Sequence, residues 1–141
     1  MRFRTVAPVL FAFIGIFVAA CSRPMPNIDL EPTVNSLFKA LQEQDVNTAL
    51  LYYSEAFYKG IPKEHWQHQL ELFAEKVGPV ESFRLRSKQA DTRFSGKFYI
   101  YQYETVHKGG EKARHIITFI HPVDGNELNL IAHKITAKNF P

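Results

Sequence analysis

The pair Gly78-Pro79 divides this chain into two parts that differ in hydrophobic periodicity. Before the pair, apolar residues recur every three to four positions, which places them on one face of a helix. After the pair, apolar and polar residues alternate, which is typical of strands with one buried face. Because proline cannot continue a helix and glycine readily ends one, this boundary predicts helices first and an antiparallel sheet second.

Three helices are predicted before Gly78. Pro32 suits the first turn of the first helix, and Asp45 is placed to cap the second. Gly60 ends the second helix and Pro62 begins the third. The apolar stripes of the three helices are Val34, Leu37, Phe38 and Leu41; Ala49, Leu50, Tyr53 and Phe57; and Trp66, Leu70, Phe73 and Val77.

Four strands are predicted after Pro79, over 80–88, 97–107, 113–121 and 128–136. Gly109-Gly110 and Asp124-Gly125 each indicate a two-residue hairpin turn, and a polar loop over 89–96 joins the first two strands. Strands joined in this order form an antiparallel meander. The sequence therefore predicts an α+β domain in which three N-terminal helices pack on a curved four-stranded antiparallel sheet.

Residues 1–20 have the three parts of a secretory signal. Arg2 and Arg4 give a positively charged start, the run 6–18 is largely apolar, and Ala19 and Ala20 are the small residues expected at a cleavage site. The apolar run is short for a membrane-spanning helix, which needs about 20 apolar residues. We therefore expect a signal peptide over 1–20.

The residues Val18-Ala19-Ala20-Cys21 resemble a bacterial lipobox, where a lipoprotein precursor is lipidated and cut. The resemblance implies a diacylglycerol thioether on Cys21. Acyl chains such as palmitate then anchor the protein in the membrane. Two or three chains bind a bilayer stably, whereas one chain binds it only marginally. Ser22 after the cysteine implies export to the periplasmic face of the outer membrane. An uncleaved membrane anchor and ordinary secretion are the alternatives.

The part after the signal peptide consists of a lipidated cysteine with a tether over 21–28 and one domain over 29–141. Pro24 and Pro26 favour an extended tether, at about 3.1 Å per residue. Cys21 is the only cysteine, so the domain has no disulfide and depends on its hydrophobic core.

The basic excess of the whole chain, 17 Lys and Arg against 14 Asp and Glu, shrinks when the signal peptide is removed. Loss of Arg2 and Arg4 leaves 15 basic and 14 acidic residues, a formal charge of +1. Neither this balance nor the predicted compartment favours a nucleic-acid partner. We expect the membrane as a partner through Cys21, and no cofactor.

The predicted layout resembles the nuclear-transport-factor-two-like fold, also called ketosteroid-isomerase-like, over residues 29–138. The resemblance rests on the element order, on the Trp66-x3-Leu70 helix that runs into Gly78-Pro79-Val80, and on the closing Asp124-Gly125…Leu128-x-Leu130 strand. It implies a cone in which helices cover a curved sheet, in a superfamily of enzymes, ligand binders, assembly subunits and small lipoproteins. A cystatin-like module, which usually has one long helix, is the alternative.

Two-residue turns at both glycine pairs set the expected strand register. Glu104 then faces His115, and Ala132 faces Ile117, on one side of the sheet. The apolar residues on this side, which we assign to the helices, are Phe98, Ile100, Ile117, Phe119, Leu128, Leu130 and Ala132.

A small-molecule pocket is one interpretation of the polar end of that face. Glu104 and His115 are candidate catalytic residues there, because a carboxylate beside an imidazole can act as an acid–base pair. Gln102, Lys134 and Trp66 are candidate ligand-binding residues. The alternative is a cross-strand ion pair, with Trp66 in the core. The resemblance transfers no catalytic role, because no residue set here matches a catalytic constellation of the superfamily.

The opposite face carries the candidate interface residues Tyr99, Tyr101, Tyr103 and His133. Tyrosine is enriched at interfaces because it buries area while its hydroxyl stays hydrated. The face therefore predicts a homodimer or an envelope protein partner, unless the C-terminal tail and the 89–96 loop cover it. Tyr101 and Tyr103 are additional candidates in the enzyme interpretation.

Two other groups of polar residues favour a solvated surface. His65 and His68 are spaced for one helix face, but a zinc site needs three or four ligands, so no metal is expected. Arg84, Arg86 and Lys88 form a basic stripe on the first strand. The alternative to a solvated surface is that this stripe binds anionic lipid headgroups or an acidic partner.

The sequence predicts a membrane-anchored envelope lipoprotein with a non-enzymatic binding or assembly domain. One alternative is a ligand carrier or an isomerase- or hydrolase-like enzyme that uses the cone pocket. A periplasmic subunit of secretion or conjugation machinery is a further alternative.

Overall fold

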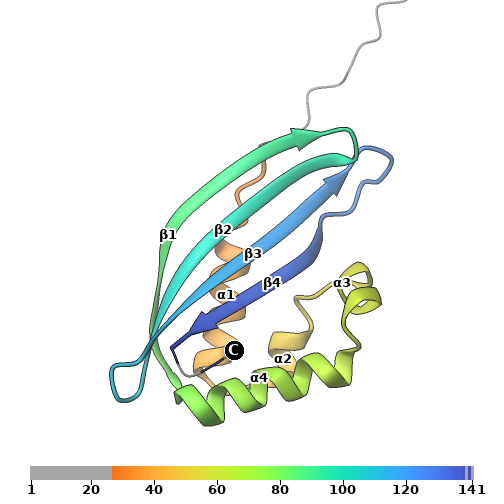
Figure 1. Ribbon diagram of the computed structural model, residues 1–141. Helices are drawn as coiled ribbons and strands as arrows, with labels where there is room; N and C mark the ends of the chain where they lie inside the picture. The colour runs from red at the N-terminus through yellow and green to blue at the C-terminus, as the bar shows by residue number, and fades with distance from the viewer. Residues whose placement is uncertain (1–26, 139, 141) are drawn as a thin grey trace, which may run out of the picture.

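The computed structural model describes residues 27–138 and 140 (Figure 1). The predicted signal peptide, Cys21 and nearly all of the tether lie outside the described residues. Four helices come first, and a four-stranded antiparallel sheet follows with strand order β1-β2-β3-β4. The predicted α+β class and the order of helices and strands are confirmed. The elements are α1 Glu31–Gln42, α2 Val46–Leu50, α3 Glu55–Gly60, α4 Lys63–Val77, β1 Val80–Arg93, β2 Gly96–His107, β3 Lys112–Pro122 and β4 Asn129–Ala137.

The second predicted helix is two short helices, α2 and α3. Asp45 caps α2 as predicted, because its carboxylate accepts a hydrogen bond from the Thr48 amide at 3.0 Å. The chain leaves the helix after Leu50 and begins α3 at Ser54, whose hydroxyl oxygen accepts from the Phe57 amide. The same hydroxyl donates to the Leu130 carbonyl at 2.7 Å, which ties α3 to β4. Serine favours such cap positions over helix interiors.

The polar segment 89–96, predicted to be a loop, mostly continues the first strand. β1 extends to Arg93, which pairs with Gly96 at the start of β2. Only Phe94 and Ser95 form the turn between the two strands. The long β1–β2 ladder explains why a polar sequence stays extended, since its backbone groups are paired along β2.

The turn between β2 and β3 has three residues, Lys108 to Gly110, and not two. The His107 amide donates to the Glu111 carbonyl at 2.8 Å, and both Gly109 and Gly110 have positive φ angles. This extra residue shifts β2 by one position relative to β3. Glu104 therefore pairs with Arg114, whereas the sequence predicted that it pairs with His115. The side chains of β2 accordingly point to the face opposite to the one expected.

A bulge in β4 changes the third ladder partway along. Leu130 pairs with Phe119 as predicted, but Ile131 is an extra residue, so Ile117 pairs with His133 and not with Ala132. The bulge turns His133 toward the helices. A similar shift at Arg86 of β1 changes which residues of that strand share a face.

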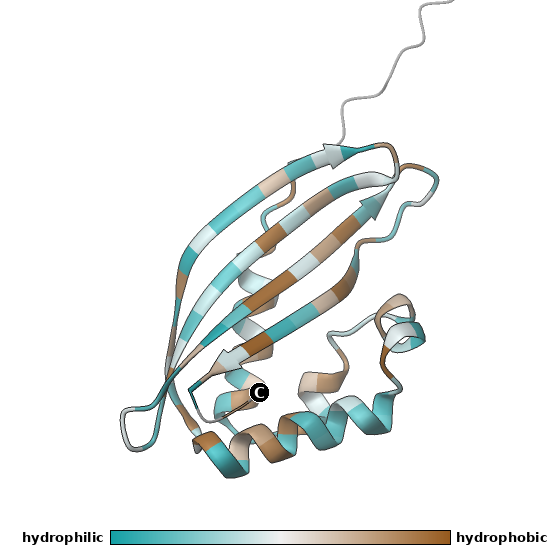
Figure 2. Ribbon diagram, viewed as in Figure 1, coloured by the Kyte–Doolittle hydropathy of each residue, from teal (hydrophilic) through white to brown (hydrophobic). Residues whose placement is uncertain are grey.

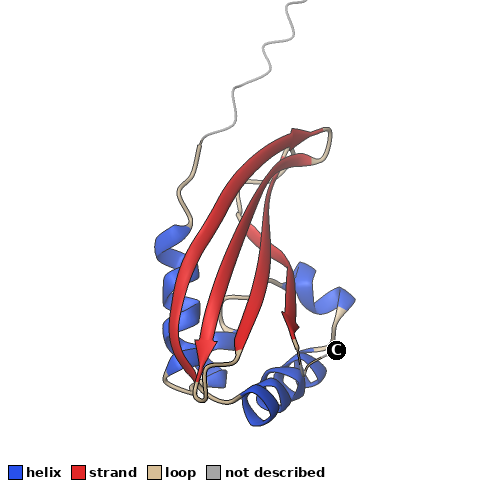
Figure 3. Ribbon diagram, turned by 60° about the vertical axis from the view of Figure 1, so that its left-hand side comes forward, coloured by secondary structure: helices blue, strands red, loops and turns tan. Residues whose placement is uncertain are grey.

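One face of the sheet packs against the helices and the other is open to solvent. On β2 and β3, buried inward residues alternate with half-buried or exposed outward residues, and Figure 2 shows the accompanying alternation in hydropathy. Figure 3 shows α1 lying alongside the twisted sheet. Phe38 of α1 is fully buried and packs on Tyr103 and His115, with ring centroids 4.8 and 5.0 Å away. No helix among residues 27–138 is long and apolar enough to span a bilayer.

Replacing Gly96 with alanine is expected to destabilise the domain by about 2 kcal/mol or more, as backbone strain typically does. The added Cβ would lie 2.3 Å from the His121 carbonyl oxygen, and the φ angle of +150° disfavours a side chain. Urea denaturation measures the change. Gly60→Ala is the control, because nothing lies within 4 Å of its added Cβ, and it should be nearly neutral. Equal stability of the two variants would contradict this account of the β1–β2 end.

Candidate functional site

The residues predicted to line a pocket lie on opposite faces of the sheet. Gln102, Glu104 and Lys134 are on the open face, whereas His115 and Trp66 are buried on the helix side. The predicted pairing of Glu104 with His115 is therefore wrong, and the cause is the three-residue turn after His107. Trp66 takes the alternative role considered above, as a core residue.

The predicted tyrosine interface is also wrong, because these side chains are in the core. Tyr99, Tyr101 and Tyr103 are 2, 2 and 1% exposed, and His133 is 7% exposed. The Tyr101 hydroxyl accepts a hydrogen bond from the Leu30 amide at 2.9 Å. These tyrosines therefore hold the segment before α1 against β2.

The other two tyrosines of this row continue the attachment. The Tyr103 hydroxyl donates to the Asn35 side chain of α1 at 2.7 Å, and the Ile28 amide lies 3.5 Å from the Tyr99 hydroxyl. The row thus runs from the first described residues into α1. Its amphipathic side chains serve an interface within the chain, between β2 and the N-terminal segment.

A continuous line of hydrogen bonds crosses the buried face of the sheet, and we call it the histidine chain. It runs from the Gly78 carbonyl through His107, Thr105, His115 and His133 to the Tyr53 hydroxyl. The successive distances are 2.7, 2.8, 3.0, 2.9 and 2.7 Å. It connects the end of α4, three strands of the sheet and the segment between α2 and α3.

The Gly78 carbonyl gives the histidine chain one direction, because a carbonyl oxygen can only accept. His107 must donate from Nδ1, so its neutral Nε2 accepts from Thr105. Thr105 then accepts from His115 Nε2, and His115 Nδ1 accepts from His133. The Tyr53 hydroxyl completes the series by donating to His133 Nδ1 at 2.7 Å. Every imidazole nitrogen in the line is satisfied when all three histidines are neutral.

Burial keeps these histidines neutral. Desolvation lowers the pKa of His133 to about 3, and the same effect, aided by His133 and His107, lowers the pKa of His115 well below its ordinary value. The pKa of His107 is also lowered by burial, against an opposing contribution from its hydrogen bond to Gly78. Burial raises the pKa of Tyr53, so its hydroxyl remains a donor.

Aromatic rings enclose the histidine chain. Phe73 of α4 meets His107 and His115 edge-on, at 5.0 and 5.7 Å between centroids. The Trp66 indole lies 5.5 Å from His133, and its N–H is buried without a hydrogen-bond partner among the described side chains. The arrangement specifies how helices and sheet pack, because any slip leaves buried nitrogens unpaired.

Two members of the histidine chain, His107 and His133, line different hollows at the surface. His107 and Gly78 line one of about 400 Å³ between α4 and the start of β1. His133 and Trp66 line another of about 460 Å³ between α4 and β4. Thr105 and His107 were not among the predicted site residues. The inward row of β2 could have identified them only with the correct register.

The open face carries a second polar group, which we call the basic band. It crosses the strands and consists of Arg84, Arg86, Lys112, Arg114, Lys134 and Lys138. All six side chains are exposed. Glu104 lies among them, 2.6 Å from Arg84 and 3.9 Å from Lys112. The hydrogen bond from Arg84 is the main cause that lowers the pKa of Glu104.

The basic band includes Arg84 and Arg86 of the predicted basic stripe but not Lys88. Lys88 does not join Arg84 and Arg86, because the bulge at Arg86 shifts the alternation of β1. Lys88 instead lies 3.3 Å from the Glu31 carboxylate and 3.5 Å from Asp29. It helps to hold the N-terminal segment to the sheet.

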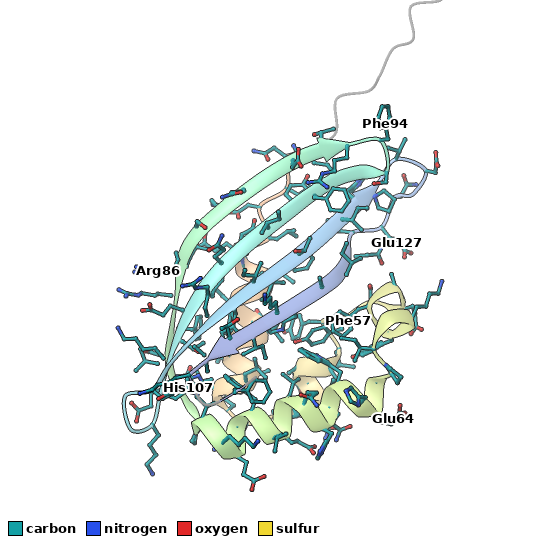
Figure 4. All side chains as sticks on the ribbon, viewed as in Figure 1. Phe57, Glu64, Arg86, Phe94, His107 and Glu127 are labelled. Atoms are coloured by element: carbon teal, nitrogen blue, oxygen red, sulfur yellow. The ribbon has the colours of Figure 1, made fainter. Side chains whose placement is uncertain are left out.

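A groove of about 680 Å³ lies within the basic band. Arg86, Lys112, Arg114 and Lys138 line it, and Glu104 is the carboxylate beside them. Figure 4 shows the Arg86 side chain projecting from β1. Arginine donates through a planar fork that matches carboxylate or phosphate oxygens, so the chemistry of the groove suits an anion.

Nothing in the described part of the chain gathers three or more histidine, cysteine, aspartate or glutamate side chains around a metal position. His65 and His68 are exposed on α4, on the side away from the buried Trp66. The expectation of a solvated helix face at these two residues agrees with their exposure.

Comparison with known proteins relates this chain to solved structures by fold. The Bd1075 protein of Bdellovibrio bacteriovorus aligns with 77% of this chain at 15% identity and a TM-score of 0.53, and this chain spans 39% of that one. A protein of Catenulispora acidiphila aligns with 78% of this chain at 15% identity and a TM-score of 0.54, with 89% of that chain covered. No family model and no curated protein matches the chain. At this identity the likeness shows a shared fold alone.

Lowering the pH is expected to destabilise the protein below about pH 6.5. The unfolded chain takes up protons on its histidines near that pH, whereas folded His133 does so only at a pKa of about 3. Each such histidine costs about 1.4 kcal/mol per pH unit across this window, so stability falls as the pH falls. Urea denaturation at several pH values measures the slope.

His133→Gln should reduce that slope, because one buried titrating group is gone. His68→Gln is the matched control, since this side chain is exposed on α4, and its slope should equal that of the original protein. A slope that His133→Gln leaves unchanged would show that the buried histidines do not govern the acid sensitivity.

Thr105→Val is expected to cost about 3 kcal/mol of unfolding free energy, because it leaves a buried donor on His115 and a buried acceptor on His107 unpaired. The shape of the side chain is conserved, so packing changes little. Thr118→Val on the open face of β3 is the control and should cost far less. Chemical denaturation of both variants provides the comparison, and equal costs would refute the role of the hydroxyl.

Proposed function

We propose that this protein is a lipid-anchored envelope lipoprotein whose domain is a non-enzymatic binding or assembly module for an anionic partner. The basic band on the open face of the sheet is the observation that carries the proposal. Six exposed cationic side chains surround one carboxylate there, although the mature chain is nearly neutral. A charge concentration of this kind favours encounter with anionic groups.

The anchoring half of the proposal rests on the sequence Val18-Ala19-Ala20-Cys21. Acylation of Cys21 and export to the periplasmic face of the outer membrane follow from its likeness to a lipobox. The order of four helices and a four-stranded meander supports the further interpretation as a nuclear-transport-factor-two-like cone. Folds of this kind host many functions, so the site must decide between them.

The interior of the domain supports a binding function over an enzymatic one. Glu104 and His115, the acid–base pair considered for an enzyme, lie on opposite faces of the sheet. The imidazoles of the histidine chain are neutral, and all their nitrogens are engaged in hydrogen bonds. Proton transfer through them would require a rearrangement of the whole line.

The open face offers two kinds of surface side by side. The basic band occupies the half near the β2–β3 turn, and half-buried apolar side chains continue the face along the strands. These apolar residues are Phe98, Ile100, Ile116 and Ile120. A partner with acidic groups beside an apolar segment fits both, because the charges direct association and the apolar area adds affinity.

Neutralising the basic band with Arg86→Gln and Arg114→Gln is expected to abolish capture of the partner in cells. The full lipoprotein is crosslinked in place, and mass spectrometry identifies the captured protein. Higher salt should weaken the interaction of the original protein, because exposed charges are screened.

The matched control is Lys59→Gln with Lys63→Gln, which makes the same change in net charge on α3 and α4. This variant should capture the partner as well as the original protein does. A partner retained by the band variant and lost by the control variant would contradict the assignment of the open face.

A further inference from the structure

The end of the sheet that carries the β1–β2 turn exposes two large apolar side chains. Phe94, in that turn, has an exposed fraction of 105%, and Val123, just after β3, has one of 54%. Figure 4 shows Phe94 projecting from the end of the sheet, far along the strands from Arg86. Exposing a whole phenylalanine ring to water is unfavourable by about 1.5–3 kcal/mol relative to burying it.

These two residues belong to one rigid structure. The Val123 amide donates to the Ser95 carbonyl at 3.2 Å, which joins the two turns. Gly96 packs so closely on His121 and Pro122 that an added Cβ would lie 2.3 Å from the His121 carbonyl oxygen. The backbone that carries these apolar side chains is therefore held in place, which lowers the entropy lost when they are buried.

The chain enters the domain near this same end. Asn27, the first described residue, lines a hollow together with Ala90 and Tyr99. Phe94, in the turn that follows β1, lies four positions beyond Ala90, about 13 Å away at the rise of an extended strand. Figures 1 and 3 both place the first described residues toward the end of the sheet that carries the β1–β2 turn.

Covalent geometry limits how far this end can stand from the lipid anchor. Six residue steps separate Asn27 from Cys21, and they span at most about 21 Å in any conformation. Strand β2 alone is about 40 Å long at the rise of an extended strand. If Cys21 is acylated, Asn27 stays within that distance of the bilayer, and the end of the sheet with Phe94 is nearer to the anchor than the end with the β2–β3 turn.

We propose that Phe94 and Val123 form a second membrane contact, inserted among the headgroups of the bilayer that holds the anchor. The contact rests on the proposed lipidation of Cys21. Apolar side chains on a rigid turn gain free energy by leaving water for the interfacial region, where aromatic residues are enriched. The anchor supplies the proximity, so a small apolar contact suffices to orient the domain.

The charges around Phe94 do not favour anionic headgroups, so the contact depends on its apolar side chains. Arg93 is paired with Asp91 at 2.7 Å, and the loop after Val123 carries the carboxylates of Asp124 and Glu127. This end of the sheet, which we call the tip, therefore lacks an excess of basic side chains that would be attracted to anionic headgroups. Added salt should leave the membrane contact intact, in contrast to binding at the basic band.

Orientation by this contact directs the basic band away from the lipid. Glu104, at the centre of the band, lies eight positions along β2 from Gly96, which corresponds to about 27 Å. The groove beside Arg86 then faces the compartment, where a partner can reach it. The membrane contact and the basic band thus lie at opposite ends of one sheet.

The test uses the full lipidated protein in vesicles of phosphatidylethanolamine and phosphatidylglycerol, with or without bromine on the acyl chains. Phe94→Trp places a fluorophore at the tip, and Leu51→Trp is the matched control, since Leu51 is 76% exposed between α2 and α3. Bromine quenches tryptophan at close range. We expect brominated lipid to remove most of the additional emission of Phe94→Trp and little of that of Leu51→Trp, at low and high salt alike.

Mass spectrometry of the same samples separates the two levels of the proposal. If the protein is acylated but brominated lipid does not quench the emission of Phe94→Trp, the tip contact alone is overturned. Protein without the acyl mass on Cys21 overturns the anchoring and, with it, the premise of the contact. Emission of Phe94→Trp that depends on protein concentration and not on lipid indicates a second copy at the tip, which also overturns the proposal. Val123→Trp repeats the measurement should Phe94→Trp fold poorly.

Discussion

The register between β2 and β3 is the constraint on which the remaining structure depends. Three residues in the turn after His107, where two would also close a hairpin, decide which side chains of β2 meet the helices. With this register, tyrosines, Thr105 and His107 enter the core, and Glu104 faces solvent beside Arg114. A side-chain period of two makes the choice absolute, since a slip by one residue exchanges the faces. Both the buried histidine chain and the exposed basic band result from it.

Much of the architecture could be predicted from local patterns in the sequence. The period change at Gly78-Pro79, the cap at Asp45 and the stripe around Trp66 identified helices followed by a meander. These signals are local, because a cap or a stripe involves residues within two helical turns. The split at Ser54 was missed since the decisive bond, from its hydroxyl to the Leu130 carbonyl, spans most of the domain.

The candidate site was far less predictable, because it depends on single-residue offsets. The Gly109-Gly110 pair is compatible with turns of two or three residues, and nothing in its composition selects one. Bulges at Arg86 and Ile131 leave no composition signal either, yet they move Lys88 to the helix side and bring His133 into the core.

The single direction of the histidine chain makes its members energetically inseparable. Each imidazole accepts a hydrogen bond because its neighbour donates one, so removing one group leaves its neighbours without a hydrogen-bond partner. Removing a neighbouring group as well then costs less unfolding free energy than the first removal did. Substitution free energies along the line are consequently non-additive. Over evolutionary change, such a unit tends to be kept whole or replaced together by apolar residues, since an intermediate with half of its bonds is less stable than either end state.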